Sequence, residues 1–317
     1  MNPIPLEKGL VVIYHMPCID GFTCRWLVNK WLQELEGVGP KGGPYRMQMD
    51  PMDVTWIPTT YGKPAPDIEV YEGQAVLIVD FSYPRKTLEA IALGASWIQV
   101  LDHHDTARKQ LEDLPYAKFD MTKSGARMLF EFLYPDAIEL FPLVLYSEDR
   151  DLWKYELPYS RDIAAFLMSQ PFSTVHYGGA NARLATPESR DLVIAEGHGI
   201  RRHVKQMTKA LADKAQRIVI GGYTLMAVND PIYRSETGEE IYTRDNTAIA
   251  CCWKFGDNNK SVIFSLRAHT DGGHHVGDIA RDLVAKGVAQ SGGGHRLAGS
   301  FEVTLGYAIL DQLGITS

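Results

Sequence analysis

The chain has 317 residues, which is the length of about two ordinary domains of roughly 100–200 residues each. Hydrophobic residues make up 45% of it and charged residues 22%, which excludes a disordered chain, a collagen-like repeat and a disulfide-dense mini-protein. No window approaches the roughly 18 consecutive apolar residues of a membrane span. There are 32 Lys and Arg residues against 39 Asp and Glu, a formal net charge of -7. Nucleic acid would therefore have to bind at a local site, through metal ions or a few basic groups.

The N-terminal segment shows no basic region, apolar stretch or cleavage site of a signal peptide. The chain has four cysteines, Cys18, Cys24, Cys251 and Cys252. They contain no C-x-x-C pair, so neither a disulfide framework nor a cysteine-rich zinc site is expected. We expect a cytoplasmic protein.

The N-terminal half alternates apolar, β-branched runs with segments of helical spacing. In chain order we expect a strand over 9–15, a helix over 21–35, an irregular excursion over 37–66, a strand over 75–81, a helix over 84–95 and a strand over 96–104. Helices are predicted over 123–135, 138–147 and 160–169. Strands that alternate with helices indicate an α/β fold with a parallel, doubly wound sheet.

A long charged helix is predicted to link two domains. The expected boundaries are a catalytic domain over 1–186, a helical linker over 187–216 and a smaller α/β domain over 217–317. The last domain combines hairpin-like strands over 217–230, 248–255 and 261–269 with a helix over 276–287.

Acidic and histidine residues gather at the ends of the predicted strands: His15, Asp80, and the triplet Asp102-His103-His104. Ligands bind at this edge of open parallel sheets. Together with Cys18, Asp20 and the pair Asp149 and Asp151, these side chains could converge on a divalent-metal centre, because Mn²⁺ and Mg²⁺ prefer oxygen ligands and Mn²⁺ also accepts imidazole. Asp80, at the end of a central strand, is placed to bridge two ions.

Four motifs, taken in order, resemble the DHH phosphoesterase superfamily with its DHH-associated C-terminal domain. They are the pattern H-x-x-x-x-D-G after the first strand, the run VLIVDF, the triplet Asp102-His103-His104 one strand later, and the C-terminal SGGGHRLAGSF. The motifs run from residue 15 to residue 300, nearly the whole chain. The resemblance implies two Mn²⁺ ions, with Mg²⁺ as a substitute. His15 and Asp80 would hold the first ion, and Asp20, Asp80, His103 and a later aspartate the second.

Two ligand positions are open. The later aspartate is expected to be Asp151, since the family places an aromatic residue four positions and a proline seven positions after this ligand, as Tyr155 and Pro158 are here; Asp149 is the alternative. The family's first motif carries D-x-D, whereas this chain has Cys18 in place of the first carboxylate. Cys18 is interpreted as a packing residue, with the possibility that it binds and shifts the metal preference.

The resemblance also implies roles around the scissile phosphate. His104 would stabilise its developing charge or protonate the leaving oxygen, and Asp102 would orient an imidazole. In the second domain, Gly293, Gly294 and His295 are expected to form a substrate-binding loop, and Arg267 to reach the substrate from a strand. The run over 269–275 is interpreted as a mobile loop.

The sequence therefore predicts a hydrolase that releases mononucleotides from di- to pentanucleotides by attack of a metal-bound hydroxide. The alternative within enzymes is a phosphohydrolase of linear or cyclic dinucleotides, pAp, polyphosphate or pyrophosphate. The alternative of another class is a catalytically impaired nucleotide-binding sensor. The expected partners are short RNA or DNA oligonucleotides or dinucleotides and no membrane, with a homodimer left open.

Overall fold

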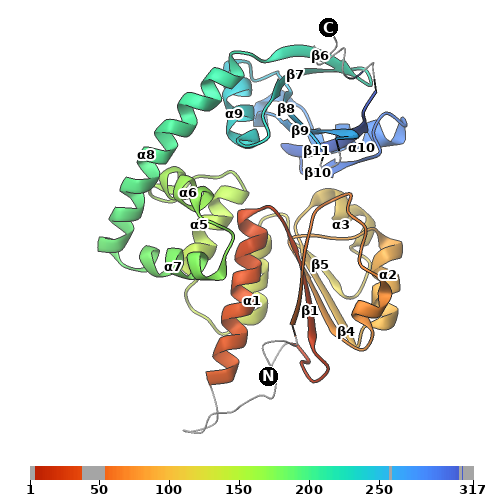
Figure 1. Ribbon diagram of the computed structural model, residues 1–317, viewed down its shortest axis with the longest axis vertical. Helices are drawn as coiled ribbons and strands as arrows, with labels where there is room; N and C mark the ends of the chain where they lie inside the picture. The colour runs from red at the N-terminus through yellow and green to blue at the C-terminus, as the bar shows by residue number, and fades with distance from the viewer. Residues whose placement is uncertain (1–3, 38–53, 257–258, 307–308, 310–317) are drawn as a thin grey trace. The chain divides into compact units, whose positions relative to one another are not determined.

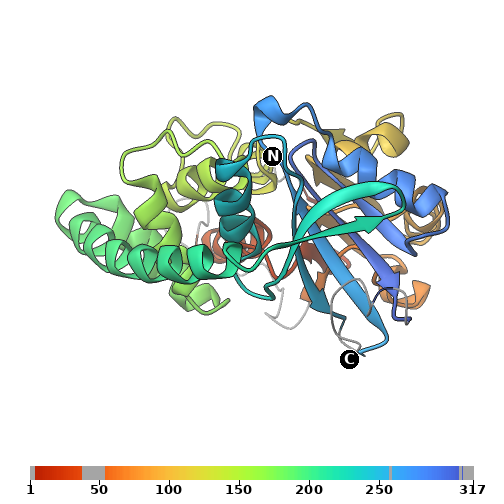
Figure 2. The same cartoon turned by 90° about the horizontal axis from the view of Figure 1, so that it is seen from above.

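The structure is a computed structural model that describes residues 4–37, 54–256, 259–306 and 309. It divides into two compact units, Met1–Arg201 and Arg202–Ser317 (Figure 1). The division falls inside one continuous helix, α8 (Pro187–Ala212), which is followed along its length in Figure 2. A helix is thus present where the sequence predicts the linker, while the three-part division into domains stays a prediction.

Unit 1 alternates strands and helices. Its elements are β1 (Leu10–His15), α1 (Ile19–Gly37), β2 (Val54–Thr59), the 3-10 helix η2 (Ile68–Tyr71), β3 (Ala75–Val79), α2 (Arg85–Gly94), β4 (Trp97–Asp102), α3 (Asp105–Leu111), β5 (Ala117–Phe119), α4 (Gly125–Leu133), α5 (Pro142–Asp151), α6 (Ser160–Ser169), α7 (Thr174–Ala185) and the first part of α8.

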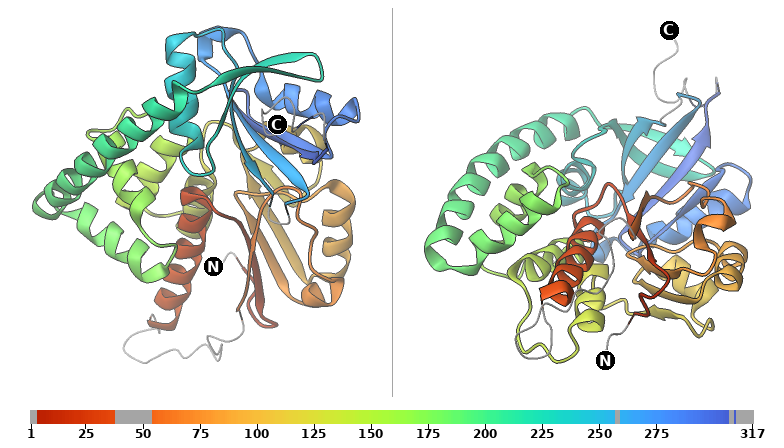
Figure 3. Two further views of the ribbon diagram at one scale, coloured as in Figure 1. Left: turned by 45° about the horizontal axis from the view of Figure 1, so that its top comes forward. Right: turned by 60° about the horizontal axis from the view of Figure 1, so that its bottom comes forward.

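The five strands of unit 1 form a parallel sheet in the order β2-β1-β3-β4-β5. Alternate residues of β1 pack into two different cores. Val12 belongs to the core shared with α1 and α4, whereas Val11 and Ile13 belong to the core shared with α2 and α3. Figure 3 shows α1 and α2 on opposite sides of this sheet. Because both faces are buried at the centre of the sheet, β1 and β3 are almost continuously apolar, as expected for a parallel sheet.

The order of the strands reverses between β1 and β3. The chain runs from β1 to β2 on one side, and then returns to place β3 on the other side of β1. Such a switch point opens a crevice at the carboxyl ends of the two strands, and ligands of doubly wound folds bind there. The predicted α/β class with a parallel, doubly wound sheet is confirmed.

Individual residues explain where two helices of unit 1 begin and how closely two others pack. Ser124 caps α4, since its hydroxyl accepts a hydrogen bond from the amide of Arg127 at 3.2 Å. Pro142 occupies the first turn of α5, where its missing N–H costs nothing. Gly197 lets α8 approach α6 closely, because a Cβ there would lie 1.9 Å from the carbonyl oxygen of Asp162.

The sequence misses five elements of unit 1: β2, η2, α3, β5 and α7. The excursion expected over 37–66 contains strand β2, which pairs with β1 along its whole length; residues 38–53 lie outside the described part of the chain. Strand β5 is three residues long and helix α7 contains two adjacent glycines, so neither gives a periodic signal. The helix expected over 138–147 lies at Pro142–Asp151, which moves Asp149 and Asp151 into its last turn.

Unit 2 is a smaller α/β unit. After the second part of α8 it contains β6 (Gln216–Ile220), β7 (Tyr223–Asn229), α9 (Arg234–Arg244), β8 (Ala250–Phe255), β9 (Ser261–Arg267), the 3-10 helix η3 (Thr270–Gly272), α10 (Val276–Ala285), β10 (Ser291–Gly294) and β11 (Ala298–Thr304).

The six strands of unit 2 have the order β10-β11-β9-β8-β7-β6, and every neighbouring pair is antiparallel except β7 and β8. Helix α10 packs in one core with Phe264 and Phe301, and α9 packs in another with Val228 and Cys252. The predicted second α/β domain is confirmed, with α9 as an element that the sequence misses. Among the described residues, no helix is both long and apolar enough to cross a membrane.

Candidate metal centre

The strand ends at the switch point of unit 1 bring the predicted ligands together. His15 is the last residue of β1, Asp80 follows β3 directly, and Asp102 is the last residue of β4. Asp80 is the common partner of two histidines: its Oδ2 lies 3.5 Å from Nδ1 of His15, and its Oδ1 lies 3.1 Å from Nε2 of His103. The same Nε2 lies 3.3 Å from Oδ2 of Asp151.

Asp80 adopts a backbone conformation that few residues with side chains tolerate. Its φ is 54°, in the left-handed region. Aspartate enters this region more readily than most residues, at a cost that is stored mainly at functional sites. The turn directs the Asp80 side chain to the histidines instead of continuing β3.

Two glycines, Gly125 and Gly21, let their helices pack closely against the candidate ligands Asp80, Asp20 and His15. A Cβ on Gly125, the first residue of α4, would lie 2.5 Å from the Cβ of Asp80 and 3.0 Å from Oδ2 of Asp20. A Cβ on Gly21 would lie 2.1 Å from the carbonyl oxygen of His15. Both positions therefore require glycine for α1 and α4 to approach the strand ends.

The arrangement fits a pair of divalent cations that share Asp80. Ligand atoms of His15, Cys18 and Asp80 lie within 4.8 Å of one another, and so do those of Asp20, Asp80 and His103. Oδ2 of Asp20 accepts a hydrogen bond from the amide of Ala126 at 3.1 Å. Oδ1 of Asp20 and Oδ2 of Asp80 are buried without a hydrogen-bond partner among the described residues. Buried carboxylate oxygens need partners, and this mixture of oxygen and imidazole donors suits Mn²⁺, while its carboxylates are also ligands for Mg²⁺.

The centre carries more negative charge than its own groups can neutralise. Burial, followed by the charges of Asp80 and Asp151, raises the pKa of Asp20 well above its usual value. Burial also acts to raise the pKa of Asp80, but its close contacts with His103 and His15 outweigh burial and hold that pKa below its usual value. For His103, burial acts to lower the pKa, but the Asp151 charge and the Asp80 hydrogen bond raise it to about 10. A bound cation would relieve the repulsion between these carboxylates.

Asp102 is fully buried and orients His104. Its Oδ1 lies 2.6 Å from Nδ1 of His104 and also accepts the amide hydrogens of His103 and His104, while its Oδ2 accepts from the hydroxyl of Ser82 at 2.6 Å. Burial acts to raise the pKa of Asp102, but the charge and hydrogen bond of His104 lower it to about 2. An ionised carboxylate only accepts hydrogen bonds, so Nδ1 of His104 carries a proton, and Nε2 is at the opposite edge of the ring.

Asp149 and Asp151 have different surroundings. The Asp149 carboxylate accepts hydrogen bonds from the amides of Glu156 and Leu157, at 3.0 and 3.3 Å, and from the hydroxyl of Ser160. It therefore fixes the segment that follows α5. Asp151 instead lies against His103, so the geometry favours Asp151 over Asp149 as the candidate ligand.

Cys18 lies at the first of the two clusters. Burial, followed by the charges of Asp80, Asp151 and Asp20, raises the pKa of its thiol well above the usual value. A thiolate is a soft ligand and a poor match for a hard cation such as Mn²⁺. The position is therefore compatible with the packing role expected from the sequence.

The predicted substrate-binding residues lie in unit 2. Arg267 ends β9, and its guanidinium donates to the carbonyl oxygen of Leu266 and the hydroxyl of Ser235. It passes close to α9, where a Cβ on Gly238 would lie 2.8 Å from the Cγ of Arg267.

The glycine run, expected to be a loop, instead forms strand β10. Gly293 pairs with Ser300 and Gly294 with Gly299 of β11. Gly294 has a φ of 135°, and a Cβ there would lie 2.4 Å from the carbonyl oxygen of Ala298. His295 follows in the turn to β11, where its amide donates to the same carbonyl at 2.7 Å. The glycines thus allow a tight hairpin, and a substrate role for Gly293, Gly294 and His295 stays a prediction.

The run over 269–275, expected to be mobile, contains η3 and the cap of α10. Nδ1 of His275 accepts a hydrogen bond from the amide of Asp278 at 3.2 Å, and Nε2 of His274 lies 2.9 Å from the carbonyl oxygen of Thr247. These contacts give two of its histidines local structural roles.

Sequence reasoning missed three residues at the centre: Ser82, Gly125 and Tyr61. Ser82 and Gly125 carry no signal apart from their contacts with Asp102 and Asp80. Tyr61 lies 5.1 Å from His104 between ring centroids, but it belongs to the segment that the sequence assigns to an irregular excursion. If the sequence had revealed β2 as the neighbour of β1, Tyr61 would have been placed at the carboxyl ends of the strands, beside the candidate ligands.

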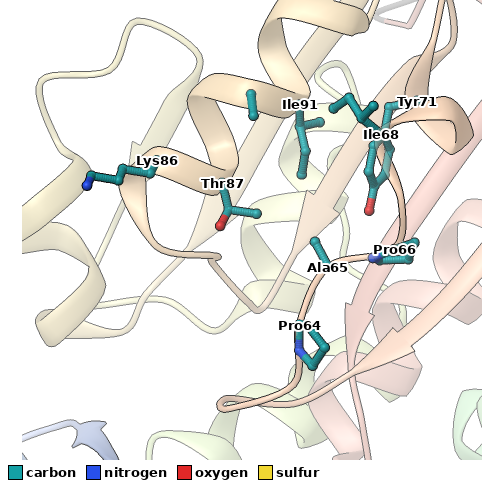
Figure 4. A pocket seen from close by; sticks show the side chains of 9 residues that line it. Pro64, Ala65, Pro66, Ile68, Tyr71, Lys86, Thr87 and Ile91 are labelled. Carbon is teal, nitrogen blue, oxygen red and sulfur yellow. The ribbon is translucent and has the colours of Figure 1, made fainter.

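A separate hollow of about 410 Å³ lies between α2 and the segment before η2 (Figure 4). Pro64, Pro66, Ile68 and Ile91 give it a largely apolar lining. None of its lining residues belongs to the clusters around Asp80.

The two-unit fold of this chain is similar to that of solved DHH-domain proteins. The DHH domain of a member of the s1p family of ribosomal proteins aligns with a TM-score of 0.58 and 16% identity, over 97% of this chain and 86% of that one. RecJ in complex with Mn²⁺ from Thermus thermophilus aligns with a TM-score of 0.51 and 14% identity, over 97% of this chain and 51% of RecJ.

Among curated proteins, an uncharacterized protein of Acanthamoeba polyphaga mimivirus is 23% identical over 300 residues. The match covers 91% of this chain but only 66% of the viral protein. No family model matches the sequence. The similarity to the DHH superfamily is thus confirmed for the fold.

Proposed function

We propose that the protein is a metal-dependent phosphoesterase that hydrolyses short oligonucleotides to mononucleotides. The observation that carries the proposal is the position of Asp80, whose two carboxylate oxygens face His15 and His103 at the switch point of the sheet. Two cations sharing Asp80 would be held by His15 on one side and by Asp20, His103 and Asp151 on the other. The structure of RecJ with Mn²⁺ supports Mn²⁺ as the first cation to test.

The bound cations would supply water of lowered pKa and neutralise charge on the phosphate. The chain's own contribution is position and proton control. Asp102 holds the Nδ1 edge of His104 and stabilises the imidazolium form, in which Nε2 carries the second proton and can donate a hydrogen bond to a phosphate oxygen or that proton to the leaving oxygen. Asp102 thereby acts through His104, and in unit 2 Arg267, Gly293, Gly294 and His295 are proposed to bind the substrate.

The charge of the chain favours a short substrate. With a formal net charge of -7, the surface offers no general attraction to a long polyanion. A substrate of a few nucleotides requires only the local positive charge that two divalent cations would create.

The test is a panel of 5′-labelled RNA and DNA from the dimer to about 20 nucleotides, with Mn²⁺ and with Mg²⁺, extended to cyclic dinucleotides, pAp and polyphosphate. We expect the highest kcat/KM on di- to pentanucleotides. The Asp80→Asn variant should show no turnover, because asparagine keeps the left-handed backbone but loses the charge. Asp113→Asn, at an exposed ion pair with Arg85, is the matched control. Intact short oligonucleotides with either metal would refute the substrate assignment, and tight nucleotide binding without product would support a sensor.

A further inference from the structure

Tyr61 lies across the carboxyl edge of the sheet in unit 1. It follows β2, the edge strand beside β1, by two residues. Its ring centroid lies 5.9 Å from that of His15 and 5.1 Å from that of His104, and both pairs meet edge to face. Its hydroxyl lies 3.5 Å from Oδ2 of Asp102, at the end of β4. The side chain therefore reaches from the edge strand past β1 to the end of β4.

These contacts restrict the imidazole of His104 from a side that Asp102 does not cover. The 2.6 Å contact with Asp102 fixes one edge of the ring, and the rings of His15 and His103 lie 5.8 and 5.0 Å from it between centroids. The edge-to-face contact with Tyr61 adds a constraint from a residue that is not a candidate ligand, because such pairs have a preferred geometry. The ring of Phe81 packs against that of Tyr61, with 4.9 Å between their centroids.

The ring contributes more to this constraint than the hydroxyl does. At 3.5 Å the hydroxyl is at the long limit of a hydrogen bond to Asp102, whereas Ser82 already donates to the same oxygen at 2.6 Å. Tyr61 is also 40% exposed, so burial of apolar surface alone does not account for an aromatic residue at this position.

We propose that Tyr61 is a positioning residue that holds the imidazole plane of His104 against Asp102, with its Nε2 edge directed to the substrate phosphate. This inference rests on the proposed function, since the orientation of His104 affects turnover only if a phosphate binds beside it. It assigns to Tyr61 a role in kcat rather than in substrate affinity.

The experiment compares Tyr61→Leu, which removes the ring, with Tyr61→Phe, which removes only the hydroxyl. We expect Tyr61→Leu to lower kcat about 10–100-fold, the usual effect of removing a group that orients a functional side chain, with little change in KM. Tyr61→Phe should keep most of the kcat of the unchanged protein, because it retains the ring. The control is Tyr134→Phe, which removes a hydroxyl that donates to Glu34 at 2.7 Å in the same unit. If Tyr61→Leu does not fold, Tyr61→Met replaces it.

A second measurement does not depend on turnover. The ¹⁵N chemical shifts of the His104 ring at fixed pH, assigned by comparison with His104→Gln, report which nitrogen carries the proton. Tyr61→Phe should keep the shifts of the unchanged protein, and Tyr61→Leu should move both nitrogens toward the tautomer average. Unchanged shifts in Tyr61→Leu, or an equal loss in both variants, would overturn the inference. If the unchanged protein hydrolyses no phosphoester, the proposed function fails, while these shifts still decide the role of Tyr61.

Discussion

Gly125→Ala is expected to damage the candidate metal centre while leaving the fold nearly intact. The added Cβ would lie 2.5 Å from the Cβ of Asp80, and ordinary contacts begin at 3.4 Å. Either α4 or Asp80 must therefore shift by about 1 Å, and 1 Å is the scale at which misplacement reduces catalysis by about 100-fold. Asp80 cannot easily make this shift, since its φ of 54° lies in a narrow allowed region.

The expected change in stability is smaller than the change in function. Overpacking of a core costs about 1–3 kcal/mol, and alanine in a helix recovers up to about 1 kcal/mol relative to glycine. We therefore expect the free energy of unfolding to fall by about 0–2 kcal/mol, and Mn²⁺ affinity and turnover to fall by about 100-fold. Isothermal titration with Mn²⁺ and urea unfolding of the metal-free protein measure the two quantities separately.

Gly179→Ala provides the matched control. Gly179 lies in α7 of the same unit, and a Cβ there would meet no atom within 4 Å. This variant should bind Mn²⁺ normally and be more stable by up to about 1 kcal/mol. Unchanged Mn²⁺ affinity in Gly125→Ala would refute the reasoning, because it would show that Asp80 can move without consequence for the ion.

Three further predictions concern single side chains. Cys18→Asp should tighten Mn²⁺ binding about tenfold or more in a titration followed by electron paramagnetic resonance, because a carboxylate charge about 4 Å from the ion contributes a few kcal/mol. Asp151→Asn should weaken Mn²⁺ binding with little change in stability, whereas Asp149→Asn should lower the free energy of unfolding by about 1–3 kcal/mol, because it disturbs buried hydrogen bonds. Asp102, whose pKa is lowered to about 2 in the folded protein, should stabilise the metal-free fold above pH about 4 and lose this contribution as the pH falls toward 2. Urea unfolding of Asp102→Asn between these pH values should show a shallower decline.

Each of these has a clear contrary result. Unchanged Mn²⁺ affinity in Cys18→Asp would leave Cys18 a packing residue outside the reach of the ion. The roles of Asp149 and Asp151 would be reversed if Asp149→Asn lost the metal and Asp151→Asn lost stability. A slope in Asp102→Asn equal to that of the unchanged protein would assign the acid sensitivity to other carboxylates.

The sequence predicts the parallel sheet and the residues at its functional edge because strand ends are marked by an abrupt change of chemistry. The apolar run before Asp80 and the one before Asp102 end at ionisable residues, so both the strand and its end are visible. The resemblance to the DHH superfamily implies Asp151 rather than Asp149, and the contact of Asp151 with His103 supports the same choice independently.

The missed features depend on contacts between distant segments. Strand β2 contains Pro58 and lies at the sheet edge, where its pairing with β1 rather than its own pattern defines it. Gly125 shows no local signal because the steric demand comes from Asp80, 45 positions earlier in the chain. The glycines before His295 predict backbone freedom, but only the pairing with β11 decides between a loop and a strand.

The hydrogen bonds of Asp149 fix the chain on both sides of the candidate ligand Asp151. The carboxylate of Asp149 accepts from the hydroxyl of Ser160 at the start of α6, and its carbonyl oxygen accepts the amides of Lys154 and Tyr155 at 2.9 and 3.3 Å. Asp151 lies between these anchored points, so its backbone is ordered by folding alone. The entropy cost of fixing this part of the centre is thus already met before a cation arrives, and the centre is preorganised by a residue that need not touch the metal.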